Sequence, residues 1–173
     1  MFEDNCSKCA ALCCVALAFD KSHLFGCDKA AGTACTHLDG KAQCGIHDDK
    51  KQQGFLGCVL YSCQGAGQRV TQECFGGQSW QDHPQQLPAM LKAFQSARKV
   101  HELLSLLSES QKLPLNSTQH QQAKNLIADL TPNPKMPNPK MSVRWLAALP
   151  YDRLEADVSQ FLKTLQPLVK KRR

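Results

Sequence analysis

Apolar residues recur every three or four positions through much of the second half of the chain. From Leu87 to Leu107, leucine, methionine, phenylalanine and valine follow this spacing, and charged residues lie between them. A single apolar face of this kind is typical of an amphipathic helix, which we expect to end near Ser110. The same spacing predicts three further helices, over residues 117–130, 143–149 and 151–165.

The first eighty residues show a different pattern. Glycines interrupt this part too often for long helices, because all ten lie between Gly26 and Gly77. The short apolar runs 59–61 and 68–71 are the best strand candidates. The predicted fold class is therefore α+β: a small, loop-rich cysteine module with short strands enclosing a metal centre, followed by a mainly helical C-terminal part.

Composition changes near residues 78–86. Every glycine precedes this boundary, whereas all nine prolines lie between Pro84 and Pro167. Residues 1–80 carry seven Lys/Arg against eight Asp/Glu, and the rest carries fourteen against seven, so the net charge of +6 arises in the second part. We predict a cysteine-rich metal-binding module over residues 1–80 and a helical region over residues 81–173.

A proline repeat interrupts the helical region. The sequence Pro-Asn-Pro-Lys-Met occurs at 132–136 and again at 137–141. Proline fixes φ and lacks an amide hydrogen, so the repeat favours an extended, stiff connector over a helix. We predict a proline-rich linker over residues 131–141.

All ten cysteines lie between Cys6 and Cys74. The apolar run 10–19 is about half the length that spans a bilayer and follows acidic residues, so we expect neither a membrane helix nor a signal peptide. The predicted location is the cytoplasm, where thiols stay reduced and available to metals. The alternative is a secreted disulfide scaffold, which an even number of cysteines would also suit.

The first cysteines follow one another closely, as Cys6-x2-Cys9-x3-Cys13-Cys14. These spacings are those of a metal knuckle or of one helical turn. Because neighbouring side chains project in different directions, we predict Cys13 and Cys14 as ligands only as a pair. A zinc ribbon would show a second close knuckle, which this sequence lacks. The remaining cysteines stand singly at irregular spacing, so further ligands would be gathered from several loops; these cysteines are Cys27, Cys35, Cys44, Cys58, Cys63 and Cys74.

Thiols at this density predict a metal centre. A 4Fe-4S cluster needs about four thiolates, and structural zinc takes four cysteines or three with a histidine. The predicted cofactor is a 4Fe-4S cluster, with zinc as the alternative; copper is the third choice, because the four methionines all lie outside the cysteine cluster. His47 follows Cys44 at zinc-site spacing, but a histidine beside a cysteine is also a common surface residue.

One further detail of the sequence lies beside Cys63. The Gly65-Ala66-Gly67 run after Cys63 lacks the full pattern of a nucleotide-binding loop, so we expect a tight turn whose amides could donate hydrogen bonds to cluster sulfur.

The cysteine pattern resembles that of the CxxCxxCC-type cysteine-cluster proteins, a family associated with zinc or iron chelation. One extra residue precedes the double cysteine here, and eight cysteines match in order over about residues 5–80: Cys6, Cys9, Cys13, Cys14, Cys35, Cys44, Cys58 and Cys63. Cys27 and Cys74 fall outside the matched pattern. We expect both to act as small buried hydrophobic residues, with a local addition to the site as the alternative. The resemblance implies a metal-binding module, and a related cluster in flagellin lysine methylases implies iron-sulfur chemistry. The strings VALAFDKS, DKAAGTAC, GFLGC and GAGQRV also resemble the domain that precedes some bacterial pentapeptide-repeat proteins, although no such repeat follows here.

Three functions are compatible with these features: a protein with a cysteine-ligated metal centre, a zinc or copper storage, buffering or sensing protein, and a metal- or cluster-dependent enzyme of unknown substrate. Asp28, Asp39, His37 and His47 are polar residues in the right stretch, but none receives a catalytic role. Stoichiometry separates the first two functions, since storage requires more than one ion or cluster per chain.

The predicted partner is the metal ion or cluster itself. The C-terminal helices could also contact a protein partner or form a homodimer. The basic tail 170–173 would attract acidic molecules, but the chain has few aromatic residues for base stacking, so we predict no nucleic-acid binding. We predict no membrane association either.

Overall fold

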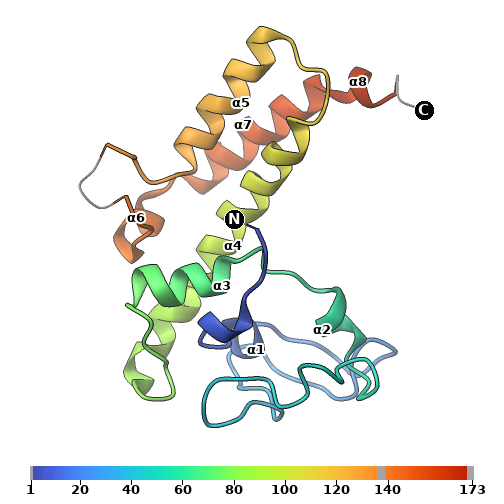
Figure 1. The fold of residues 1–173 in the computed structure, drawn as a ribbon, viewed down its shortest axis with the longest axis vertical. Coiled ribbons are helices and arrows are strands. Elements are labelled where there is room, and N and C mark those ends of the chain that lie inside the picture. Colours follow the sequence, from blue (N-terminus) through green and yellow to red (C-terminus); the bar gives the residue numbers. More distant parts are fainter. Residues whose placement is uncertain (1, 136–138, 171–173) are drawn as a thin grey trace.

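The structure, a computed structural model, describes residues 2–135 and 139–170. Helix α4 runs through the middle of the molecule, with α5 and α7 packed beside one half of it, while α1, α2 and the cysteine-bearing loops lie at its other end (Figure 1). Part of the linker and most of the basic tail lie outside the described residues. The α-helices are α1 (Leu12–Ala16), α2 (Leu56–Leu60), α3 (Ala66–Arg69), α4 (Leu87–Ser110), α5 (Ser117–Asp129), α6 (Val143–Ala148), α7 (Tyr151–Thr164) and α8 (Gln166–Lys170).

The predicted α+β class is wrong. Helices account for 52% of the structure, and its described residues contain no strand or sheet. Residues 59–61 fall at the end of α2, and residues 68–71 pass from α3 into the wider helical turns of 70–74. In the described part, β-type pairing is limited to isolated bridges of Phe19 with Lys29 and Leu38 with Cys44. Such short apolar runs do not distinguish strand from helix by pattern alone.

The helices predicted from apolar spacing are confirmed. Helix α4 ends at Ser110 as expected, and α5, α6 and α7 begin at the predicted residues. Asn116 caps α5: its side chain accepts a hydrogen bond from the Gln119 amide at 2.8 Å, and the Gln119 side-chain oxygen accepts one from the Asn116 amide at 3.0 Å. This reciprocal pair satisfies two amides that the first turn of a helix leaves without partners.

One hydrophobic core joins the first helices to the last. Leu12 and Val70 from the cysteine-rich part belong to the same buried cluster as Phe94 and Leu107 of α4 and Phe161 of α7. The core therefore crosses the proposed boundary at residue 80. The division into two modules stays a prediction.

The segment between α1 and α3 contributes little to this core. Over residues 17–65, the buried hydrophobic residues are Ala42 and Phe55. Loops with so few buried apolar side chains are weakly stabilised by the hydrophobic effect. Four of the predicted cysteine ligands lie in this segment, so another interaction is needed to hold it in one conformation.

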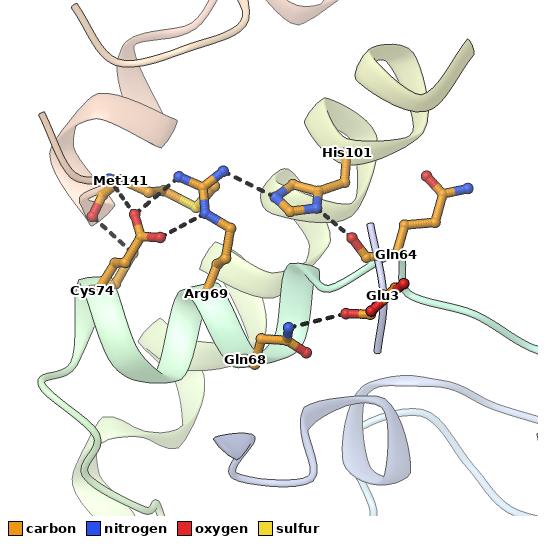
Figure 2. Close-up of polar contacts among 8 residues, drawn as sticks. Glu3, Gln64, Gln68, Arg69, Cys74, His101 and Met141 are labelled. Atoms are coloured by element: carbon orange, nitrogen blue, oxygen red, sulfur yellow. Dashed lines mark hydrogen bonds and ion pairs between the residues drawn. The ribbon is translucent and has the colours of Figure 1, made fainter. Parts of the chain in front are cut away.

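A polar network fastens α3 to α4 and to the end of the linker (Figure 2). The Arg69 guanidinium donates two hydrogen bonds to the Glu73 carboxylate, at 2.6 and 3.0 Å, and approaches His101 Nε2 at 3.3 Å. His101 Nδ1 lies 2.6 Å from the Gln64 carbonyl oxygen, so Nδ1 carries the hydrogen and the ring is neutral. Glu73 also accepts a hydrogen bond from the Met141 amide at 2.7 Å.

In the described residues, no helix combines the length and the apolar character needed to cross a bilayer.

Candidate functional site

The eight predicted ligand cysteines line a single cavity of about 1250 Å³. Its walls come from the N-terminal segment, α1, the loops between α1 and α3, and Phe94 of α4. Cys27 and Cys74 do not line it; the Cys74 thiol instead donates to the Met141 carbonyl at 3.6 Å. All ten cysteines are free thiols. The cysteines that line the cavity are Cys6, Cys9, Cys13, Cys14, Cys35, Cys44, Cys58 and Cys63.

The thiols surround the cavity without meeting at one point. No group of three or more Cys, His, Asp or Glu side chains within residues 2–135 and 139–170 is placed to hold a metal ion as it stands. The adjacent Cys13 and Cys14 sulfurs are 3.9 Å apart, a separation that thiolate ligands of a metal ion can have, but in the described part of the chain no third ligand lies with them. A four-coordinate zinc would need sulfurs at about 2.3 Å from the ion, so binding requires the loops to close inward.

Gly67 allows two of the thiols to approach α3 closely. A Cβ atom on Gly67 would lie 2.7 Å from Cys9 Sγ and 3.7 Å from Cys63 Sγ, so both sulfurs occupy the space that a larger side chain would take. The preceding Gly65 has φ of 80°, a left-handed conformation that glycine adopts readily, and it starts α3 directly after Cys63. The predicted turn after Cys63 is thus a glycine-initiated helix that packs against thiols.

Asp4 holds the N-terminal segment against this helix. Its Oδ1 atom accepts hydrogen bonds from the Gly65 amide at 2.8 Å and from the Cys63 thiol at 3.1 Å. The Gln68 amide group donates to the Glu3 carbonyl at 3.0 Å (Figure 2). These contacts place Cys6 and Cys9 beside Cys63, although more than fifty residues separate them in sequence.

A buried lysine organises the opposite wall. Lys29 is 8% exposed, and its ammonium group donates to the carbonyls of Val15, Ala30 and Thr33 at 2.8–3.1 Å. Burial lowers the pKa of Lys29, while the neighbouring Cys35 and Cys14 thiolates would raise it. The lysine therefore ties the end of α1 to the loop that carries Cys35 and places a cation near the thiols.

Two further loops complete this wall. The Cys35 amide donates to the Cys14 carbonyl at 3.0 Å, and Leu38 pairs with Cys44 across a tight turn. The His37 and Phe55 rings meet edge to face, with centroids 4.8 Å apart, which brings the segment of Cys58 against this turn. Cys14, Cys35, Cys44 and Cys58 are thus positioned by one connected set of loops.

Backbone strain in the described residues is concentrated beside cavity cysteines. The non-glycine residues with positive φ are Ala11 at 52°, Ala42 at 53° and Gln64 at 54°. Each lies within two residues of Cys13, Cys44 or Cys63. A left-handed conformation costs a non-glycine residue about 1–2 kcal/mol, and such strain is typical of functional sites.

Burial keeps several of these thiols protonated at neutral pH. It raises the pKa of Cys9 and of Cys58 to about 11 and that of Cys63 to about 12. The Leu12 amide opposes the rise at Cys9, and the Gly67 amide opposes it at Cys63. The pKa of Cys13 is also raised, first by its hydrogen bond to Cys14 and then by burial. A metal that binds here must displace protons, so its affinity will increase with pH.

Two other cavity residues carry polar groups. His47 lies 3.1 Å from the Asp48 carboxylate, and its side chain is 52% exposed; its role as a ligand stays a prediction. The buried Tyr61 hydroxyl has no hydrogen-bond partner among the described residues. It is available to a polar group bound in the cavity.

The acidic residues considered for catalysis have local roles. Asp28 accepts a hydrogen bond from the Lys21 amide at 2.6 Å. Asp39 accepts from the amides of Lys41 and Gln43, each at 2.8 Å, and these bonds lower the pKa of its carboxyl group. Neither residue lines the cavity. Both side chains therefore stabilise turns in the cysteine loops.

The cavity fits a thiolate-bound metal centre. Its donors are soft sulfur atoms from eight cysteines, which zinc, copper(I) and iron-sulfur clusters prefer. Amides of Leu12 and Gly67 face two of the sulfurs, and the Tyr61 hydroxyl is an unused donor at the wall. Such surrounding hydrogen bonds orient ligands and tune a bound metal.

Comparison with known proteins gives one informative match. The chain is 34% identical over 169 residues to "Uncharacterized protein YybG" of Bacillus subtilis (strain 168), a match that covers 96% of this chain and 58% of that protein. The match extends over both the cysteine-rich part and the helical part of this chain. No protein-family model matches the chain. No solved structure matches it either.

Sequence reasoning did not find several residues of the site. Lys29, Asp4 and Tyr61 carry no motif, because their roles depend on contacts between distant segments. Gly67 was noted for its amide but not for the room it leaves beside Cys9. A signal for it was present, since a glycine inside a helix is unfavourable unless close packing requires it.

Proposed function

We propose that this chain is a metal-centre protein whose N-terminal cysteines hold a 4Fe-4S cluster or zinc through thiolates. The observation that carries the proposal is the shared cavity: eight cysteines from the N-terminal segment, α1, α2 and the loops before α3 line it, and the two remaining cysteines do not. Cysteines with unrelated structural roles would not be expected to line one cavity together.

The weak core of residues 17–65 supports the same function. This segment buries little apolar surface yet carries Cys35, Cys44, Cys58 and Cys63. Metal-thiolate bonds would supply the missing stabilisation, as they do in small metal-dependent domains. The bound metal would also offset the strain at the positive-φ residues.

The cavity volume favours a cluster, or more than one ion, over a single ion. One zinc ion with sulfurs at about 2.3 Å fills a small fraction of a cavity of this size. A 4Fe-4S cluster also takes thiolate ligands from separate loops. When bound, such a cluster would supply one-electron redox chemistry, and zinc would supply structure or Lewis acidity.

The test is anaerobic purification followed by an absorption spectrum and measurement of iron, zinc, copper and acid-labile sulfide per chain. A brown protein with matched iron and sulfide would establish the cluster. A colourless protein with tightly held zinc would establish the zinc alternative. A chain that purifies without metal, and takes up none when reconstituted, would overturn the proposal.

A further inference from the structure

The cavity thiols fall into two sets with different supports. In the first set, Cys9 and Cys63 converge on the space left by Gly67, and Asp4 bonds both the Cys63 thiol and the start of α3. Cys6 begins the turn that leads to Cys9, whose amide donates to the Cys6 carbonyl at 3.2 Å. This set is built from the N-terminal segment and α3.

The second set is built from the loops on the other wall. Cys35 is bonded to the backbone of Cys14, and the turn containing Cys35 pairs with Cys44 through Leu38. Phe55 and His37 bring Cys58 to this turn. In the described part of the chain, no hydrogen bond joins Asp4 or Gly65 directly to Cys35, Cys44 or Cys58. The two sets meet at the thiols of Cys13 and Cys14, whose sulfurs are 3.9 Å apart.

The short helix α1 joins the two sets. Cys13 and Cys14 are consecutive on α1, so their Cα atoms are about 100° apart around the helix axis, and their sulfurs lie 3.9 Å from each other at the place where the two sets meet. Cys14 belongs with Cys35 by its backbone contact, which leaves Cys13 as the fourth member of the first set. Each set then has four thiols, the number that zinc or a 4Fe-4S cluster takes.

We propose that the cavity holds two separate metal centres, one on Cys6, Cys9, Cys13 and Cys63 and the other on Cys14, Cys35, Cys44 and Cys58. This inference rests on the proposed function and specifies its stoichiometry. It explains why the chain has two consecutive cysteines on α1: each serves a different centre. It also explains why eight thiols, twice the number that one centre needs, line the cavity.

The experiment is a titration of metal-free protein with cobalt(II) under anaerobic conditions, followed by visible absorption and native mass spectrometry. Wild type should bind two cobalt ions per chain with thiolate charge-transfer bands. Cys63→Ser and Cys35→Ser should each bind one. The controls Cys27→Ser and Cys74→Ser change thiols outside the cavity and should still bind two. Far-UV circular dichroism checks each variant, because α4–α7 contain no cysteine and should keep their signal.

Electron paramagnetic resonance of the wild type gives a second readout that needs no variant. Two separate centres should show two uncoupled cobalt(II) ions. Binding of one ion per chain, or exchange coupling between two ions through a shared thiolate, would overturn the inference and leave the proposed function standing. A chain that binds no cobalt and purifies without metal would instead overturn both.

Discussion

The two ends of helix α4 are stabilised in different ways. Toward its C-terminal half, α5 and α7 pack against it and bury a continuous apolar face that includes Leu107, Val158 and Phe161. At its other end, long loops surround a cavity, and residues 17–65 bury only Ala42 and Phe55 among their hydrophobic side chains. The helical end is held by packing that the chain itself provides, whereas the cysteine end depends on its loop contacts and, under the proposed function, on the metal that its thiols would bind.

Removal of metal should produce the largest difference in stability between the cysteine end and the helical end. If thiolate bonds hold the loops, a chelator should make residues 17–65 susceptible to protease while α4–α7 stay protected. The effect should be large, because structural zinc contributes roughly 10–16 kcal/mol to small metal-dependent domains. Limited proteolysis with mass spectrometry would measure it. Equal protection of the loops with and without chelator would contradict the comparison.

A core substitution should affect the helical end. Leu107→Ala removes a fully buried side chain of α4 and should lower the free energy of unfolding by about 2–5 kcal/mol. Its neighbour Leu106 is 45% exposed, so Leu106→Ala should change stability by less than about 0.5 kcal/mol. Thermal unfolding measures both. Loss of metal from Leu107→Ala at temperatures where it stays folded would contradict the independence of the two ends.

Gly67→Ala should affect the cysteine end. The added Cβ would press on Cys9 Sγ at 2.7 Å, while alanine itself suits the helix. We expect metal affinity to fall by about 10–100-fold, as for changes in groups that position ligands, with little loss of helical signal. Gly40→Ala is the control, since a Cβ there meets nothing within 4 Å. Competition with a chelator would measure affinity; equal values for the two variants would disprove the role of Gly67.

Gln64→Gly should stabilise the protein. Gln64 adopts φ of 54°, and its side-chain Oε1 is buried without a hydrogen-bond partner in the described part of the chain. Relief of the left-handed strain, less the entropy cost of glycine, should raise the free energy of unfolding by about 1 kcal/mol. The same change at the exposed helical residue Gln122 should lower it by about 1 kcal/mol. Chemical denaturation should therefore show a higher free energy of unfolding for Gln64→Gly and a lower one for Gln122→Gly.

The smallest expected effect is a pH dependence at the junction of the two ends. Burial chiefly lowers the pKa of His101 below its ordinary value of 6.5, so the folded protein favours the neutral ring. The stability from this group is complete above pH 6.5 and is lost as pH falls through the lower folded pKa. The denaturation midpoint should be lower at pH 5.5 than at pH 7.5. His101→Gln should reduce this difference between the two midpoints, and the exposed His120→Gln should not.

The helical end was predictable because one physical pattern determines it. Apolar spacing near 3.6 residues gave the first residue of four helices, and in α4 it also gave the last. The cysteine end was predictable only in part. The match of eight cysteines to the CxxCxxCC-type pattern selected the eight that line one cavity, but the enclosing structure was wrongly expected to contain strands. Loops of this kind are determined by contacts between distant segments, such as Asp4 with Gly65 and Lys29 with Thr33, which have no periodic signature.

The order of the segments along the chain has a consequence for synthesis. Phe94 of α4 forms part of the cavity wall, and every cavity cysteine precedes it in sequence. A ribosome adding roughly 5–20 residues per second therefore releases all eight thiols before the wall can form. During that interval the nascent loops are open to incoming metal and equally to oxidants. The redox state of the cell during translation therefore determines whether a metal or an oxidant reaches the thiols first.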